Sequence, residues 1–134
     1  MTSPSALKYM SAVFITFSGN CQQALKFYQS CFGGLLQLDV FEQALPGYAQ
    51  MPLVSGCLRS AKVVIRASDL VHHEGRIIGN YMAIYIHCDD EADRFALIKK
   101  LELGKKNRSG KPNATAKLVE IIDVFGVRWV LGLG

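Results

Sequence analysis

The first half of the chain has one stretch of helical spacing set between strand-like stretches. Residues 11–17 are rich in β-branched and aromatic side chains, which favour a strand. Apolar side chains then recur every three or four residues, which predicts an amphipathic helix. They are Ala24, Leu25, Phe27, Tyr28, Cys31 and Phe32. Further strands are expected at 35–42, 53–59 and 62–68, with a loop at 43–52.

The second half repeats this order after a loop at 69–79. Residues 80–88 predict a strand, and Asp89-Asp90-Glu91 opens a helix with acidic residues that favour its dipole. The helix has an expected apolar face and ends at Gly104. That face consists of Ala92, Phe95, Ala96, Ile98 and Leu101. A short basic strand near 104–109 and two strands at 114–123 and 127–133 complete the prediction.

Local signals mark both ends of the first helix. Asn20 is a favourable N-cap, and Gln23 three residues later completes an arrangement like a capping box. Gly33 and Gly34 end the helix, because glycine adopts the left-handed closing conformation at little cost. We therefore expect this helix to form the packing layer of the first half.

Composition indicates one globular domain. The chain has 134 residues, of which 50% are hydrophobic and 19% charged, and this excludes a disordered protein. The net charge is +4, and the positive charge is concentrated between Lys105 and Lys111. That segment lacks interleaved aromatic residues and a nucleic-acid motif, so we expect a solvated hairpin and no nucleic-acid partner.

The cysteine spacing and the hydropathy pattern indicate in which cellular compartment the protein is expected. Cys21, Cys31, Cys57 and Cys88 form no CxxC pair and match no zinc spacing. No apolar run reaches the roughly 18–20 residues that span a bilayer, and the N-terminal residues lack a secretory apolar region. We expect a soluble, cytoplasmic protein with reduced thiols and no membrane partner.

Four pieces of sequence resemble the vicinal oxygen chelate superfamily, which includes glyoxalase I, extradiol dioxygenases and antibiotic-resistance proteins. The closer resemblance is to its PhnB-like branch. The pieces are the run from Phe14 to Gly34 with Gly19-Asn20-Cys21 and Phe27-Tyr28, then Ala67-Ser68-Asp69, then Asp89-Asp90-x-Ala-Asp-x-Phe95, and Asp123-x-Phe-Gly-Val-Arg-Trp129. The first and last pieces are the more specific, and together the four span nearly the whole chain.

The resemblance implies an α+β fold of two βαβββ modules, at about 8–70 and 79–134, within a single domain at 1–134. The modules would form half-open barrels with the helices on the outer face. The resemblance also implies a homodimer that builds two cavities. It implies little about a reaction, because this fold hosts many activities.

The superfamily's metalloenzymes hold a divalent ion with four side chains on strands, usually His, Glu or Gln. The matching positions here are Val13, one of Val63, Val64 and Ile65, Met82 or Ala83, and Val130. None offers the oxygen or imidazole donor that such an ion needs, so we expect no metal and no cofactor. His72-His73-Glu74 is interpreted as a polar loop rather than a metal site, and His87 as a structural histidine.

The cavity implied by the resemblance would have a largely apolar wall. Val13, Ile15 and Phe17 are expected on its face of the first strand and Phe14 against the helix. Arg128 would share the face of Val130, while Trp129 would point to the dimer seam unless a bulge turns it inward. The candidate cavity-lining residues are Ile15, Phe17, Tyr48, Tyr81, Tyr85, Arg128 and Trp129.

Cys21, Glu120 and Asp123 are further candidates for chemistry. Cys21 at a helix N-terminus is either a reactive thiolate or a buried structural thiol. Glu120 and Asp123 lie three apart and face opposite sides, so they make no acid–base pair, and Asp123 is expected to cap the turn at Phe125-Gly126.

Three functions remain open. The first is a metal-free dimer that binds a small, largely apolar molecule in a cavity. The second is a metal-dependent lyase, isomerase or dioxygenase of the same superfamily. The third is a structural dimer whose cavity is filled by its own side chains. The loop from Leu45 to Leu53 would be a lid under the first function and a plug under the third.

Overall fold

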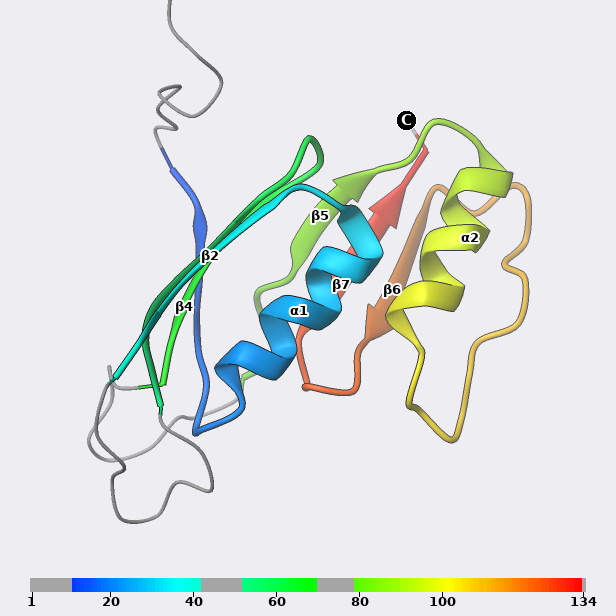
Figure 1. Ribbon diagram of the computed structural model, residues 1–134. Helices are drawn as coiled ribbons and strands as arrows, with labels where there is room; N and C mark the ends of the chain where they lie inside the picture. The colour runs from blue at the N-terminus through cyan, green and yellow to red at the C-terminus, as the bar shows by residue number, and fades with distance from the viewer. Residues whose placement is uncertain (1–10, 42–51, 70–78, 134) are drawn as a thin grey trace, which may run out of the picture.

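The computed structural model describes residues 11–41, 52–69 and 79–133 and arranges them in two sheets with two helices (Figure 1). Each half of the chain forms one sheet. The elements are β1 (Val13–Thr16), α1 (Cys21–Phe32), β2 (Leu35–Val40), β3 (Leu53–Arg59), β4 (Val64–Ser68), β5 (Ile84–His87), α2 (Glu91–Leu101), β6 (Leu118–Ile122) and β7 (Arg128–Gly132).

The strand topology is repeated in the two sheets. The first has the order β1-β4-β3-β2 and the second the order β5-β7-β6. In each sheet the strand before the helix pairs in parallel with the last strand of its half, β1 with β4 and β5 with β7. The other pairs, β2–β3, β3–β4 and β6–β7, are antiparallel. This arrangement confirms the α+β class read from the sequence, with the order βαβββ in the first half and βαββ in the described residues of the second.

Helix α1 lies in the angle between the two sheets and packs against both (Figure 1). On the first sheet, Leu25 lies directly over Gly56 of β3, where an added Cβ would overlap its Cδ1 atom. On the second sheet, the rings of Tyr28 and Phe32 contact Trp129 of β7, with centroids 5.5 and 5.2 Å apart. The buried positions of α1 are Cys21, Ala24, Leu25, Tyr28 and Cys31, while Phe27 and Phe32 are half-buried.

The N-terminus of α1 is capped from a distant strand end rather than by its own capping box. Asn20 occupies the N-cap position but makes no side-chain cap hydrogen bond. Instead Oδ1 of buried Asp69 accepts from the backbone N–H groups of Gly19 (2.7 Å) and Cys21 (3.1 Å), and Oδ2 accepts from Leu53 N–H (2.9 Å). The predicted Asn20–Gln23 box is therefore wrong, and a carboxylate at the end of β4 instead satisfies the neighbouring donors of Gly19 and Cys21.

Helix α2 begins as expected but buries a different face. Asp90 caps it by accepting from Asp93 N–H at 2.7 Å. Ile98 and Leu101 are buried as predicted, whereas Ala92 and Ala96 are exposed. Arg94 and Leu97 take their places. The Arg94 guanidinium is buried because it donates to the carbonyls of Ala116 (2.7 Å) and Asn113 (3.5 Å), which ties the following loop to the helix.

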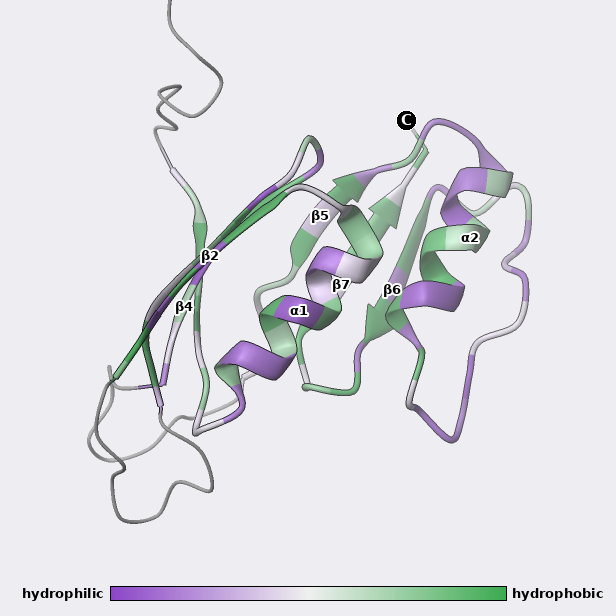
Figure 2. Ribbon diagram, viewed as in Figure 1, coloured by the Kyte–Doolittle hydropathy of each residue, from purple (hydrophilic) through white to green (hydrophobic). Residues whose placement is uncertain are grey.

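The basic strand predicted near 104–109 is not formed. Residues 102–117 connect α2 to β6 through turns, and this connection is largely purple in Figure 2, the colour of hydrophilic residues. Its polar groups are satisfied locally: Glu102 accepts from Ser109 N–H (2.8 Å) and from its hydroxyl (2.9 Å). With few apolar side chains to bury, this segment gains little from sheet pairing. The second sheet therefore has three strands in the described part of the chain.

Within the described ranges, neither helix has the length and apolarity needed to cross a membrane.

Candidate functional site

A groove of about 420 Å³ runs between β1 and β5, the edge strands at which the two sheets face each other. We call it the β1–β5 groove. Among the described residues, its walls are hydrocarbon, aromatic or thioether side chains, and the one charged lining residue is Arg128. The lining residues are Ala12, Val13, Phe14, Ile15, Met82, Ala83, Ile84, Val127 and Arg128. A smaller hollow of about 250 Å³ adjoins it and shares Met82 and Arg128 while adding Tyr81.

The groove opens onto the sheet surface that neither helix covers, which we call the helix-free face. Large apolar side chains stand exposed on it. They are Phe14 (54% exposed), Leu35 (62%), Tyr85 (49%), Leu118 (63%) and Ile122 (38%). Their register partners include Arg66, Arg59, Val130, Gly132 and Arg128.

The face predicted for β1 is reversed. Val13 pairs with Ile65 and Ile15 with Ala67, and both partners are buried under α1. Phe17 lies beyond the end of β1 and is 1% exposed in the same core. Phe17 therefore lies in the core rather than on a cavity wall, and the expectation that Phe14 packs against the helix is wrong, because Phe14 faces away from it. Ile15 still contributes to the β1–β5 groove because β1 is an edge strand.

The other candidate residues divide between the groove and the core. Arg128 and Tyr81 line the groove and its neighbouring hollow, and Tyr85 lies on the helix-free face. Trp129 is fully buried against α1, so it lies neither at a seam nor in a cavity, although it does face opposite to Arg128 as expected. Tyr48 and the loop with His72 and His73 lie outside the described residues.

Arg128 is held in place by an ion pair across the second sheet. Its Nη2 atom donates to Glu120 Oε2 at 2.6 Å, and the two side chains are 21% and 51% exposed. Glu120 therefore faces the open side while Asp123 is buried, which confirms that the two carboxylates are not paired. Glu120 therefore compensates the charge of Arg128, the one charged side chain among the described lining residues of the groove.

Buried Asp123 fixes the turn that carries Val127 and Arg128. Its Oδ1 accepts from the backbone N–H groups of Phe125 (2.8 Å) and Val127 (3.1 Å), as the sequence predicted. Its Oδ2 accepts from the Tyr28 hydroxyl (2.7 Å) and from Trp129 Nε1 (2.9 Å). One carboxylate thus joins α1 to the second sheet beside the groove.

Two of the four positions implied for a metal line the groove, and the side chains present do not fit a metal. Val13, Met82 and Ala83 line it, and Val130 lies on β7 next to Trp129. Valine and alanine side chains have no donor atom, and a thioether is a poor ligand for a hard divalent ion. In residues 11–41, 52–69 and 79–133, no three His, Cys, Asp or Glu side chains come together as a metal site.

We expect purified chain to retain no bound metal at this position. After incubation with Zn²⁺, Ni²⁺, Fe²⁺ and Mn²⁺ and dialysis against metal-free buffer, elemental analysis should find well below one ion per chain. Close to one ion per chain would mean that donors from elsewhere complete a site, and the metalloenzyme function would then take precedence.

Burial makes three of the four thiols poor nucleophiles. Burial, with a smaller contribution from the Asp69 carboxylate, raises the pKa of Cys21 from 9.0 to about 12. Burial also raises the pKa of Cys31 to about 11 and raises that of Cys88. Cys21 is 0% exposed, so the structural interpretation of this residue is favoured over a reactive thiolate.

The raised pKa values of these thiols predict that the folded protein loses stability at high pH. A thiol whose folded pKa is raised favours the folded state while it is neutral; this contribution is complete below the unfolded pKa of 9.0 and is lost as pH rises toward 11–12. The urea concentration at the unfolding midpoint should therefore decrease as the pH is raised from 8 to 10.5, and it should decrease less in Cys21→Ala.

Iodoacetamide at pH 8 should label Cys21 slowly in native protein and rapidly in denaturant. Fast labelling of native Cys21 would contradict its burial.

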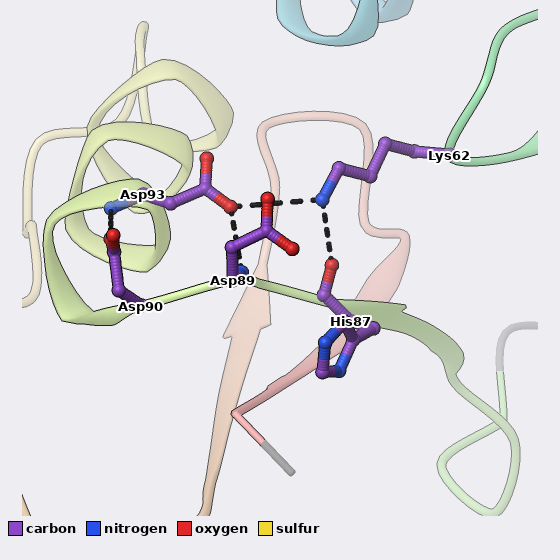
Figure 3. Close-up of polar contacts among 5 residues, drawn as sticks. All are labelled: Lys62, His87, Asp89, Asp90 and Asp93. Atoms are coloured by element: carbon purple, nitrogen blue, oxygen red, sulfur yellow. Dashed lines mark hydrogen bonds and ion pairs between the residues drawn. The ribbon is translucent and has the colours of Figure 1, made fainter.

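A second junction between the halves lies at the start of α2 (Figure 3). Lys62, in the turn between β3 and β4, donates to the carbonyl of His87 (2.8 Å) and lies 3.6 Å from Asp93. Asp93 also accepts from Asp89 N–H at 3.0 Å, so it links the cap of α2 to the first sheet. The Lys62–Asp93 pair is 36% and 42% exposed, and such pairs stabilise little. His87 itself is exposed, and its backbone carbonyl is the group that accepts from Lys62.

The helix-free face carries one functional candidate that sequence reasoning missed, a hollow of about 190 Å³ over β2, β3 and β4. We call it the basic hollow. It is lined by Gln37, Leu38, Asp39, Ser55, Gly56, Cys57, Arg59 and Arg66. The sequence contained a signal for this hollow. Arg66 stands between Ile65 and Ala67 in the middle of a strand, and its charged side chain must point away from the core.

The fold is similar to that of several solved structures. A PhnB protein from Bacillus cereus superposes with a TM-score of 0.73 at 21% identity, over 94% of this chain and 100% of that chain. Protein PA1353 from Pseudomonas aeruginosa gives a TM-score of 0.72 at 21% identity, over 94% and 98%. The At5g48480 gene product of Arabidopsis thaliana gives 0.55 at 16% identity, over 94% and 99%.

These similarities confirm the resemblance read from the sequence at the level of fold: the chain has the fold of the PhnB protein. No family model matches the sequence, and no curated protein matches it.

Proposed function

We propose that two copies of this chain associate through their helix-free faces and bind a small, largely apolar molecule in the β1–β5 groove. The observation that carries the proposal is the groove itself. Its volume of about 420 Å³ lies in the range of small-molecule sites, roughly 300–1,000 Å³. Its walls would favour an apolar ligand through the hydrophobic effect.

The chemistry of the lining supports binding rather than catalysis. Phe14, Ile84 and Val127 offer apolar contact, and Met82 adapts to ligands of different shape because its side chain is unbranched and flexible. Arg128 is the one titratable side chain among the lining residues, and Glu120 already pairs with it. The described part of the groove therefore offers no free acid and base for proton transfer.

Association would cover the exposed apolar side chains of the helix-free face. Leu118 and Phe14 stand far enough out of the sheet to contact a second copy, which would also close the open side of the groove. A bound molecule would then be shielded from water, as the cavity of a binding protein requires.

The dimer is tested by sedimentation equilibrium of untagged protein, which should give twice the chain mass of 14.8 kDa. Leu118→Glu should shift the mass toward the monomer, because it places a charge in the proposed interface. Leu103→Glu is the matched control, since Leu103 is also exposed (49%) but lies just after α2 and belongs to no strand. A monomeric wild-type protein would overturn the dimer.

Ligand binding is tested with N-phenyl-1-naphthylamine, an uncharged apolar dye that fluoresces when removed from water. Wild-type protein should bind it saturably, and Met82→Glu should weaken binding about tenfold or more, because a charge would replace apolar contact in the groove. Leu103→Glu should leave the affinity within about twofold of wild type. Absence of saturable binding would reject the binding function and favour the structural dimer.

A further inference from the structure

We propose that the ligand of the β1–β5 groove is a short, extended, apolar peptide whose backbone hydrogen-bonds to the free edges of β1 and β5. This inference rests on the proposed function and specifies the chemical class of its ligand. It is supported by the strand order of the two sheets, by the direction of the backbone groups at their edges, and by the free-energy cost of burying such groups without partners.

β1 and β5 each end a sheet, because the strand orders are β1-β4-β3-β2 and β5-β7-β6 in the described part of the chain. An edge strand pairs on one side only, and on its other side the backbone N–H and C=O groups have no strand partner. The β1–β5 groove lies between these two open sides, with Phe14 and Ile84 among its lining residues. The groove therefore has a polar backbone component in addition to its largely apolar side chains.

The register of β1 shows which backbone groups point to the groove. Phe17 N–H, just beyond the strand, donates to the carbonyl of Ser68 at 2.9 Å. Backbone groups of successive residues in a strand point to opposite sides, so those of Phe14 point away from β4. In the described residues, the N–H and C=O groups of Phe14 make no hydrogen bond.

The same holds for β5 on the other side of the groove. Cys88 N–H donates to the carbonyl of Gly132 at 2.8 Å. Tyr85 lies three residues earlier, so its N–H and C=O groups point away from β7. They too lack a partner within the described ranges. Each edge of the groove thus offers one donor and one acceptor at a defined position.

A hydrocarbon ligand would leave these groups without partners. Burial of an N–H or C=O group away from water without a hydrogen bond costs free energy, and closure of the groove by a second copy would exclude water. An extended peptide avoids this cost, because its own backbone groups point alternately to its two sides. One peptide residue can pair with Phe14 and the next with Tyr85, while apolar side chains contact the groove lining.

The test compares a peptide with its ester analogue as competitors of N-phenyl-1-naphthylamine. N-acetyl-valyl-valyl-valine amide is uncharged and apolar, and its β-branched side chains favour an extended backbone. In the analogue, an oxygen atom replaces the central N–H group and the side chains are unchanged. Wild-type protein should bind the peptide about tenfold more tightly, because the analogue loses one hydrogen bond and leaves an edge acceptor unpaired.

Proline substitutions assign the preference to the strand edges. Phe14→Pro removes the N–H group that points to the groove and keeps the hydrogen bonds between β1 and β4, since proline is tolerated at such edge positions. Phe14→Ala is the matched control, because it removes the same ring and retains the N–H group. Phe14→Pro should bind the peptide about tenfold more weakly than Phe14→Ala, while the two variants bind the dye within about twofold of each other. Tyr85→Pro and Tyr85→Ala repeat the comparison on β5.

The outcomes separate this inference from the function beneath it. Equal affinity of wild-type protein for the peptide and its ester analogue would overturn peptide recognition and leave the apolar binding function intact; this comparison needs no variant. Equal peptide affinities of the folded proline and alanine variants, at both positions, would also overturn it. If the uncharged dye does not bind saturably to wild-type protein, both proposals fail.

Discussion

Replacing Asp123 with alanine should lower the free energy of unfolding by about 3–5 kcal/mol, one of the largest losses expected in this chain. The carboxylate is 3% exposed and accepts four hydrogen bonds, from two backbone N–H groups, the Tyr28 hydroxyl and Trp129 Nε1. Alanine would leave these donors buried without acceptors and would open a cavity between α1 and the second sheet.

Two milder changes give a graded series around this residue. Tyr28→Phe removes one donor and should cost about 1 kcal/mol. Asp123→Asn keeps the shape but places an amide N–H group against Trp129 Nε1, which can only donate, so its cost should fall between the other two. Urea denaturation, followed by circular dichroism and by the emission of Trp129, the one tryptophan of the chain, measures all three. A loss below about 1 kcal/mol for Asp123→Ala would contradict the role assigned to this carboxylate.

Gly56→Ala should destabilise the chain by about 1–3 kcal/mol, because it overfills the contact between α1 and the first sheet. An added Cβ would overlap Leu25 Cδ1 and approach Leu53 Cδ2 to 2.8 Å, and both leucines are buried. Leu25→Ala alone should cost about 2–5 kcal/mol by leaving a cavity. The double variant should cost less than the sum of the two, since removal of the Leu25 side chain makes room for the new methyl group.

Gly132→Ala is the matched control for this prediction. An added Cβ there meets Tyr85, whose side chain is 49% exposed on the helix-free face and can rotate away. Its cost should therefore be smaller than that of Gly56→Ala. Urea midpoints of the four variants test the series. Equal losses for Gly56→Ala and Gly132→Ala, or strict additivity of Gly56→Ala with Leu25→Ala, would show that close packing of α1 on β3 does not limit stability.

Strong local periodicity predicted most elements and their order. The spacing of Ala24, Leu25, Tyr28 and Cys31 predicted α1 and its buried positions, because these residues repeat with the helical period. Sheet alternation located the strands of both halves, including β3, whose bounds at 53–59 were predicted correctly. The segment at 104–109 was the exception, because its few apolar residues leave strand and turn indistinguishable by pattern.

Faces and long-range partners were predicted less well. Alternation shows that Phe14 and Ile15 point to opposite sides of β1 but does not indicate which side the helix covers. The pairing of β1 with β4 decides which side the helix covers. Val13 and Ile15 pair with Ile65 and Ala67, which are buried in the core beneath α1. In the same way, the Asp69 cap depends on residues about 50 positions apart in sequence, which no local signal relates to the helix start.

The sequence by itself determined the order of elements, the duplicated plan and the resemblance to the PhnB-like fold, because these depend on local periods and short motifs. It also determined that the implied donor positions carry no ligand for a hard metal ion. Only the tertiary structure decided that the sheets meet at a groove between β1 and β5, that Trp129 belongs to the core, and that Arg59 and Arg66 share one hollow. These features arise from the packing of α1 between two sheets and from strand register, which relate residues far apart along the chain.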